Sequence, residues 1–383
     1  MGDFEVTNVA ESSDVPSYLK GYEELYRREP RAAALEWFKD AQFGLGMHYA
    51  LCSLVTEGMG KDPDDPLTTY QFKLLRACLT PDDWLKVRDR FTAERFDADF
   101  ITDLALEAGA RYVWFTTKHY GGLYMWDTKA TDFNSVNSPA GRDLVAELSE
   151  QCQKKGLGLC LYHPGDVMKR DPRELFKREG GILRELLTQY GPIANIWFDG
   201  IQQFYRNPGQ YRVAETYRLI RSLQPQCLIS FKTGATGDED FAACEGLPCP
   251  PLPPRLTEAG RPIPSSELAP ISSKKWGEVA ERAWKMNRGK RGELIEQMQT
   301  APRQYFYIEG GKSLNADQVM LVMATAFAHN ANLLLNTNPR FDGSIPEDQV
   351  ATLREVGRRI RENGWPRPKL LDKKVWRSWS KNK

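Results

Sequence analysis

Residues 157–200 carry the pattern that decides the fold: LGLCLYHP (157–164), then GGILRELLTQYGP (180–192), then ANIWFDG (194–200). The first and last of these runs are apolar on both faces of an extended chain, as in parallel strands that helices cover on both sides. The middle run has helical spacing and stops at a Gly-Pro pair, which is typical of a helix end. A strand, a helix and a strand in close succession predict a parallel βαβ unit.

The same alternation recurs along the chain and predicts a barrel. Five further apolar runs have the length of a strand: FGLGMHYA (43–50), RYVWFTTKH (111–119), CLISFKTG (227–234), RQYFYI (303–308) and NANLLLN (330–336). Helical patterns lie between them, at 98–110, 141–157 and 210–225. At least six such units favour an α/β fold with a closed (β/α)8-type, TIM-like barrel over an open doubly wound sheet. Neither G-x-G-x-x-G after a strand nor G-x-x-x-x-G-K-[ST] occurs, so the phosphate loops of nucleotide-binding folds are missing.

The chain divides by composition into three parts. Residues 1–35 are polar and read as an N-terminal arm, residues 36–366 as the barrel domain, and residues 367–383 as a C-terminal tail. Within the barrel, residues 246–290 are rich in proline and polar residues, which excludes a helix or a central strand. We expect a long loop over one face of the barrel; a surface insertion is the alternative.

Charge and cysteine content exclude several classes of protein. The 383 residues carry 52 basic and 51 acidic side chains, so we expect neither nucleic acid nor a membrane surface as a partner. The N-terminus lacks the features of a signal peptide, which leaves open a cytoplasmic protein or an exported one whose signal was removed. Seven scattered cysteines without a C-x-x-C pair indicate neither a zinc site nor a disulfide framework. The sequence leaves undecided whether the protein forms a homo-oligomer.

Polar side chains gather where the predicted strands end. Parallel barrels place their active sites at the carboxyl ends of their strands. The residues at these ends, or within the fifth strand for the lysine, are His48, Lys118, His119, Tyr162, His163, Asp199 and Lys232. The chain has four histidines, and three of them are in this set. We therefore expect the three imidazoles to meet at the barrel mouth and to serve function.

A metal site is the alternative interpretation of these residues. Three histidines and Asp199 suit zinc or iron as ligands. Metallohydrolase barrels usually carry an H-x-H pair on one strand, and none occurs here. We predict no metal and no other cofactor.

Asp199 is the strongest single candidate for catalysis. It ends IWFDG (196–200), where three large apolar residues precede it and Gly200 follows. A carboxylate at the end of a buried strand is unfavourable unless it has partners or a chemical role. Gly200 indicates a tight turn that exposes the carboxylate to the cleft. A helix cap is the competing interpretation, and the neighbouring histidines favour catalysis.

Five segments together resemble the α-L-fucosidases of glycoside hydrolase family twenty-nine. They are WFKDAQFGLGMHYALCSL (37–54), AGARYVWFTTKHYGGLYMWDTKATDFNSVNS (108–138), GRDLV (141–145), YGPIANIWFDG (190–200) and NANLLLNTNPRFDGSIPEDQVATLREVGRRIRENG (330–364). The resemblance extends from Trp37 to Trp365. It implies a glycosidase that releases a terminal fucose or a similar sugar from a carbohydrate.

The resemblance also implies roles for single residues. Asp199 matches the nucleophile of a retaining mechanism, which needs two carboxyl groups about 5–5.5 Å apart. His48 and His119 would bind sugar hydroxyls, Trp126 would contribute to the sugar pocket, and Tyr162 would lie beside the nucleophile. The other residues counted with the substrate-binding set are Tyr120, His163, Trp197 and Lys232.

The general acid is expected in FKTGATGDEDFAACEG (231–246). By position, Lys232 matches a residue that is commonly an arginine in the family, and Glu245 matches the general acid of the family. The acid needs a raised pKa while the nucleophile stays ionised. Three other glutamates remain as rivals: Glu239, Glu293 and Glu296.

The sequence departs from the family pattern near the substrate. Tyr120 replaces the second histidine of a pair, and Lys232 cannot offer the two parallel hydrogen bonds of an arginine. The Glu-Trp pair of many members has no match in DPLTTYQFKL (65–74), which offers Thr69, Tyr70 and Gln71. We expect no C-terminal β-sandwich, because 18 residues follow Trp365. Two alternatives therefore stay open: a catalytically weak glycan-binding barrel, and a metal-dependent hydrolase.

Overall fold

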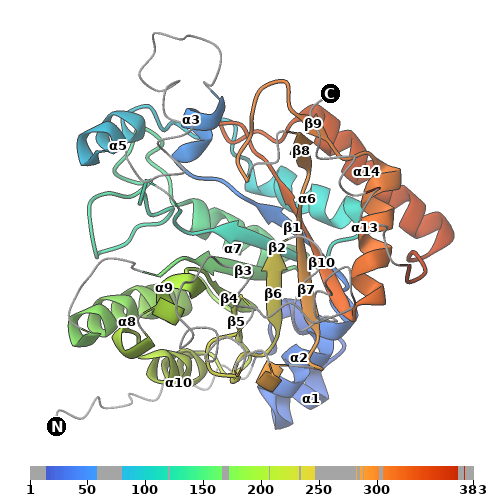
Figure 1. Ribbon diagram of the computed structural model, residues 1–383, viewed down its shortest axis with the longest axis horizontal. Coiled ribbons are helices and arrows are strands. Elements are labelled where there is room, and N and C mark those ends of the chain that lie inside the picture. Colours follow the sequence, from blue (N-terminus) through green and yellow to red (C-terminus); the bar gives the residue numbers. More distant parts are fainter. Residues whose placement is uncertain are drawn as a thin grey trace, which may run out of the picture.

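A parallel barrel forms the centre of the molecule in a computed structural model (Figure 1). The structure describes residues 14–57, 80–119, 121–165, 172–206, 208–232, 234–245, 282, 285–287, 289–301, 305–369 and 375. Eight parallel strands follow one another in the order β5-β4-β3-β2-β1-β10-β7-β6. The two outermost strands of that order also meet, since the N–H of Ala243 donates to the carbonyl of Lys232 at 2.9 Å. The predicted (β/α)8-type barrel is thus confirmed.

The barrel strands are short and buried. Their bounds are β1 Phe43–Met47, β2 Tyr112–Thr116, β3 Gly158–His163, β4 Asn195–Phe198, β5 Leu228–Phe231, β6 Ala242–Glu245, β7 Gly292–Gln297 and β10 Ala331–Thr337. A small antiparallel pair, β8 (Gln299–Ala301) with β9 (Lys312–Ser313), follows β7. The prediction of a strand at 303–308 was wrong for its described part, since residues 305–308 form none. The sixth and seventh barrel strands are β6, which has only four residues, and β7, whose polar residues hid it from an apolar pattern.

Helices surround the strands (Figure 1). Their bounds are α1 Glu23–Arg28, α2 Pro30–Ala41, α3 Cys52–Glu57, α5 Pro81–Arg88, α6 Ala98–Ala108, α7 Leu144–Lys155, α8 Pro172–Gln189, α9 Ile201–Arg206, α10 Val213–Leu223, α13 Ala316–Ala328 and α14 Glu347–Asn363, with 3-10 turns η1 (Ser17–Leu19) and η2 (Pro208–Gln210). Local chemistry fixes their ends. The carboxylate of Asp97 accepts the N–H of Phe100 at the start of α6, and left-handed Gly109 ends that helix. No helix in the described ranges is long and apolar enough to cross a membrane.

Two glycines of β1 make room inside the barrel. A Cβ atom on Gly44 would lie 2.1 Å from the ring of Tyr112. A Cβ atom on Gly46 would lie 1.8 Å from the amide oxygen of Asn336. Real side chains cannot approach so closely, so the FGLGM pattern of β1 lets larger side chains of β2 and β10 fill the interior.

The N-terminal segment belongs to the barrel packing. Trp37 and Phe38 of α2, with Tyr18 of η1, share one buried cluster with Tyr112 and other inward-facing side chains. The rings of Phe38 and Phe241 stack with centroids 4.2 Å apart. The predicted boundary between arm and barrel, at residues 35 and 36, falls inside α2. Most of the proline-rich segment, 246–281 among it, lies outside the described residues.

Candidate active site

Asp199 follows β4 and meets three donors at the carboxyl ends of three strands. The hydroxyl of Tyr162, from β3, donates to Oδ2 at 2.7 Å. The ammonium of Lys232, just after β5, lies 3.2 Å from Oδ1. The N–H of Gly200 donates to Oδ1 at 2.6 Å, and Gly200 has the left-handed φ of +80° that a tight turn needs. The carboxylate remains 25% exposed, so a ligand can reach it.

These contacts keep Asp199 ionised. Burial raises the pKa of a carboxyl group, because it penalises the charged form. Here the positive charge of Lys232 and the hydrogen bonds from Tyr162 and Gly200 outweigh burial, and the pKa of Asp199 lies below its usual value. An anionic oxygen at the barrel mouth is therefore available near neutral pH.

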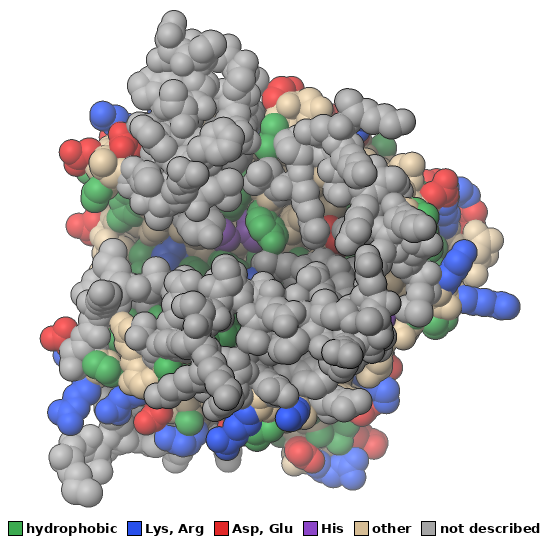
Figure 2. Space-filling model, in the orientation of Figure 1, with side chains coloured by type: hydrophobic (Ala, Val, Ile, Leu, Met, Phe, Trp, Pro, Cys, Tyr) green, Lys and Arg blue, Asp and Glu red, His purple; other side chains and the backbone are tan. Residues whose placement is uncertain are grey.

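Two histidines lie beside this carboxylate. The rings of His48 and His119 are 4.7 Å apart, and His119 stacks on Tyr162 at 5.2 Å. Burial lowers the pKa of His48 far below the usual value, and lowers that of His119 to about 4 although Asp199 opposes the shift. Both imidazoles are thus neutral at pH 7, and each can accept and donate one hydrogen bond. Figure 2 shows histidine side chains at the centre of this face of the molecule.

The ring nitrogens of His48 suit a ligand. Both are buried, and neither has a hydrogen-bond partner within the part of the chain that the structure describes. Buried polar atoms normally have partners, so two open nitrogens in one ring call for an explanation such as a bound hydroxyl group. Neighbouring rings fix the imidazole, with Trp114 stacked on it at 5.4 Å.

Tyr305 and Phe306 complete an aromatic wall that sequence reasoning missed. Their rings lie 5.2 Å and 5.0 Å from the ring of His48, and Phe306 also lies 5.0 Å from His119. Both belong to RQYFYI, the run mistaken for a strand. Three aromatic residues within a short segment after β7 were the available signal. Aromatic faces pack against the apolar face of a sugar ring.

Lys232 and Trp197 extend the cluster into the barrel. Lys232 has a positive φ of +48°, which is uncommon for a residue with a side chain. Its ammonium lies 4.8 Å above the ring of Trp197, and that ring stacks with Tyr162 at 5.6 Å. The structure thus brings together five of the predicted residues around Asp199: His48, His119, Tyr162, Trp197 and Lys232.

Two predicted residues lie elsewhere. His163 is fully buried, and its Nε2 is 2.6 Å from the carboxylate of Glu179 on α8. Neighbouring residues of a strand face opposite sides, so His163 faces the helices while Tyr162 faces the barrel. Trp126 is also fully buried, and its indole donates to Glu185 of α8 at 3.1 Å. Both side chains thus bind glutamates of α8, and their part in substrate binding stays a prediction.

The structure describes the candidate acids unevenly. Glu245 is the last residue of β6, paired with Ile295 of β7, and its side chain lies outside the described residues. Tyr120 and the segment 65–74 lie outside them as well. Glu239 is fully buried, and its carboxylate accepts bonds from three backbone N–H groups, from Tyr217 and from Asn287. These hydrogen bonds outweigh the effect of burial and hold the pKa of Glu239 below its usual value. A carboxyl group with a lowered pKa is poorly suited to act as the general acid.

Two glutamates of β7 are equally buried. Glu296 is fully buried, and its Oε1 accepts the N–H of Gln297 at 3.0 Å. Glu293 is 1% exposed and lies beneath Trp197, whose indole it binds. Burial raises the pKa of Glu293 to about 7, yet both of its oxygens already accept hydrogen bonds from other residues. Both carboxylates are thus more enclosed than that of Asp199, which is 25% exposed.

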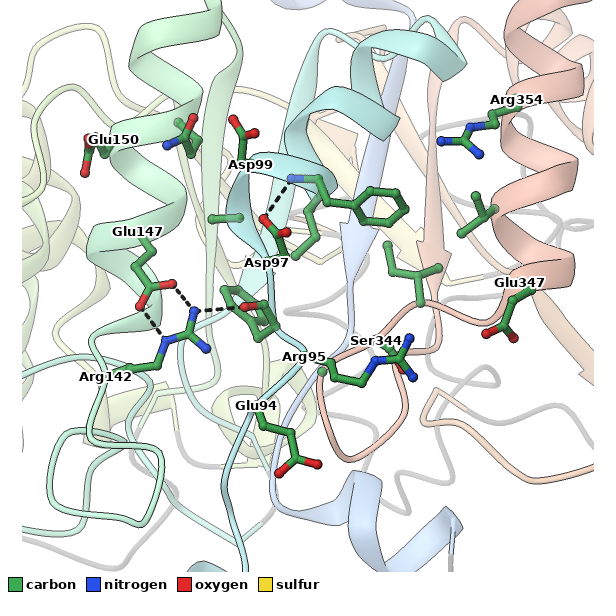
Figure 3. Close-up of a pocket in the computed structure, with 18 of the residues that line it drawn as sticks. Glu94, Arg95, Asp97, Asp99, Arg142, Glu147, Glu150, Ser344, Glu347 and Arg354 are labelled. Atoms are coloured by element: carbon green, nitrogen blue, oxygen red, sulfur yellow. Dashed lines mark hydrogen bonds and ion pairs between the residues drawn. The ribbon is translucent and has the colours of Figure 1, made fainter.

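A groove lined by other residues lies on the described surface (Figure 3). It has a volume of about 870 Å³ and runs past residues 94–101, the starts of α7 and α14, and Arg354. Its most enclosed cation, Arg142, is already bound to Glu147 and to the carbonyls of Ala93 and Phe96. No predicted site residue lines it. Among the described residues, no three His, Cys, Asp or Glu side chains are grouped to hold a metal ion.

A sequence model described as "Alpha-L-fucosidase" matches residues 9–247 and 272–365. The chain belongs to the α-L-fucosidase family. Among α-L-fucosidases, that of Dictyostelium discoideum is 23% identical over 354 residues, covering 84% of this chain and 68% of the relative. The tissue α-L-fucosidase of Bos taurus is 29% identical over 212 residues. The chain spans 44% of the bovine relative and 64% of a relative from Caenorhabditis elegans.

Solved structures of α-L-fucosidases share the fold. Isoenzyme 1 from Paenibacillus thiaminolyticus superimposes with a TM-score of 0.64 at 24% identity, over 88% of this chain and 77% of that one. The Lactobacillus casei α-L-fucosidase in complex with α-L-fucose gives a TM-score of 0.59 at 19% identity, over 86% of this chain and 98% of that one. These likenesses agree with the barrel seen here.

Proposed function

We propose that the protein is a retaining exo-glycosidase that releases a terminal α-L-fucose, or a related sugar, from a glycoconjugate. The observation that carries this proposal is the ionised carboxylate of Asp199 at the barrel mouth, held by Lys232 and Tyr162 beside two neutral histidines. Membership of the α-L-fucosidase family supports the choice of substrate.

The reaction would proceed in two displacements at the anomeric carbon. An oxygen of Asp199 bonds to that carbon while the glycosidic C–O bond breaks, and the departing oxygen takes a proton from an acid, for which we propose Glu245. A water molecule then attacks the same carbon and gives its proton to the acid residue, which is now a carboxylate. The bond to Asp199 breaks, and the nucleophile is restored.

The neighbours of Asp199 divide the remaining work. Lys232 and Tyr162 hold the carboxylate ionised and aimed, which is what a nucleophile requires. His48 and His119, both neutral, would bind sugar hydroxyls as acceptors or donors. Tyr305 and Phe306 would pack on the apolar face of the sugar. The lysine at position 232 is the reason to include sugars related to fucose.

The direct test is turnover of an aryl α-L-fucoside, with the first-formed anomer of the released sugar observed by NMR. We expect α-L-fucose first, and a 2-fluoro analogue should leave a sugar-sized mass on the peptide that contains Asp199. A β anomer formed first would overturn the retaining mechanism. Binding of fucosylated glycans without turnover would favour the glycan-binding alternative, and loss of turnover with a chelator would favour the metal-dependent one.

The acid is tested separately with leaving groups of different quality. Glu245→Ala should retain activity on substrates with good leaving groups, lose it on natural glycosides, and recover with azide. The matched control is Glu296→Ala on the neighbouring strand. If Glu296→Ala shows this pattern instead, the assignment of the acid moves to Glu296.

A further inference from the structure

Glu293 is a buried carboxylate that the proposed reaction does not use. It lies on β7 inside the barrel, where an ionisable group is unfavourable unless its oxygens have partners. The hydroxyl of Tyr112 donates to Oε1 at 2.7 Å, and the indole N–H of Trp197 donates to Oε2 at 3.0 Å. Both donors are themselves buried, on β2 and β4. The carboxylate therefore ties together the inward faces of three strands.

Trp197 connects this carboxylate to the catalytic one. Tyr162 stacks against the indole at 5.6 Å with 28° between the planes, and the ammonium of Lys232 lies 4.8 Å above it. Tyr162 and Lys232 both contact Asp199. The orientation of the Trp197 indole thus affects the positions of both Tyr162 and Lys232.

We infer that Glu293 is a positioning residue, which fixes the indole of Trp197 and through it the two partners of Asp199. This inference rests on the proposed function, since it assigns Glu293 a part in the same reaction. An indole whose N–H loses its acceptor in a buried site must leave that donor unsatisfied or turn. A turned ring would no longer offer the same face to Tyr162 and Lys232, and small displacements of catalytic groups have large effects on rate.

The first experiment observes the hydrogen bond without any substrate. In protein labelled with ¹⁵N-tryptophan, each of the ten tryptophans contributes one indole signal, and Trp197→Phe identifies that of Trp197. We expect Glu293→Leu to move this signal upfield, because the proton loses a carboxylate acceptor. Glu293→Gln should move it less, since its amide can accept from Trp197 and donate to the hydroxyl of Tyr112. An unmoved signal in Glu293→Leu would overturn the inference.

The second experiment measures turnover in the same variants. Glu293→Leu should lower kcat about 10–100-fold with a smaller change in KM, and Glu293→Gln should recover most of that loss. Tyr112→Phe is the matched control, since it removes the other donor to Glu293 and keeps the bond to Trp197. Its indole signal and its kcat should resemble those of the unchanged protein. Equal losses of kcat in Tyr112→Phe and Glu293→Leu would contradict the specific role of Trp197.

The two experiments separate this inference from the proposed function. If Asp199→Asn retains normal turnover, the nucleophile assignment fails, while the indole signal still reports whether Glu293 holds Trp197. If Asp199→Asn is inactive and Glu293→Leu folds, turns over normally and keeps its indole signal, only the positioning role fails. Thermal unfolding of each variant shows whether it folds.

Discussion

The mouth and the interior of the barrel each hold a carboxylate, and the two behave in opposite ways. Asp199 has an ammonium group, a hydroxyl and a backbone N–H around it, and its pKa is lowered in spite of burial. Glu293 has a hydroxyl and an indole N–H, both neutral, and burial raises its pKa to about 7. Asp199 has a cation in addition to its neutral donors, whereas the two neutral donors to Glu293 reduce the penalty of burial without reversing it. One fold thus maintains an ionised carboxylate and one that titrates near neutrality.

The largest effect is expected from removing the charge at the mouth. Asp199→Asn keeps the shape of the side chain and cannot form the bond to the anomeric carbon, so kcat should fall by about 10³-fold or more. Steady-state turnover of an aryl fucoside measures this. The unfolding temperature should change little, which separates lost chemistry from lost structure. Near-normal turnover would show that the charge of Asp199 is not needed for the reaction.

The interior carboxylate should make stability depend on pH. Its pKa is raised on folding, so the folded state holds its proton more tightly, and stability falls as pH rises from about 4.5 to about 7. Glu293→Gln removes this dependence, and relative to the unchanged protein it should gain up to about 3 kcal/mol between pH 4.5 and pH 8. Urea unfolding at both pH values measures the gain. The exposed Glu107→Gln is the control, and an equal change there would remove Glu293 as the cause.

The cation at the mouth can be removed without touching the carboxylate. Lys232→Met leaves burial to act on Asp199 with less opposition, so the pKa of Asp199 should rise. Because the nucleophile must be ionised, the acidic limb of the pH profile of kcat/KM should move to higher pH, with a loss of about 10–100-fold at pH 5. Lys232→Arg keeps the charge and should move the limb much less. An unmoved limb in Lys232→Met would show that another group sets the pKa.

The smallest effect is expected from one hydroxyl. Tyr162→Phe keeps the ring that stacks on Trp197 and His119 and removes the hydrogen bond to Asp199. A bond to a charged group contributes about 1.5–3 kcal/mol, part of which water can replace at this partly exposed carboxylate, so kcat/KM should fall about tenfold. The acidic limb should again move upward, by less than in Lys232→Met. A larger shift than in Lys232→Met would reverse the ranking of cation over neutral donor.

The fold and the centre of the site could be predicted from strand ends. Apolar runs bounded by glycine and proline identified β1 to β5 and β10, and the polar residues that follow parallel strands must share one edge of the barrel. Asp199, Tyr162, Lys232, His48 and His119 therefore converge as expected. The sixth strand was missed because it has only four residues. The seventh was missed because a closed barrel buries polar residues such as Glu293 in its interior, which breaks the apolar pattern.

The direction in which a side chain points was harder to predict than the strand end at which it lies. Tyr162 and His163 are adjacent at one strand end, so both cannot face the barrel, and the period of two in a strand would have excluded one of them. The sequence does not show which of these two residues faces the barrel. Trp126 depends on a partner, Glu185, that is 59 residues away and on another element. The aromatic wall of Tyr305 and Phe306 resembled a strand because aromatic runs are common in both settings.

Gly44 bears no functional group and yet limits how this chain can change over evolutionary time. Any side chain there would meet the ring of Tyr112, whose hydroxyl is bound to Glu293. A single added methyl group on β1 would therefore disturb a row of contacts that ends at Asp199, which follows β4. A substitution at this position would therefore be expected to lower activity in a related protein that keeps every residue of the proposed active site.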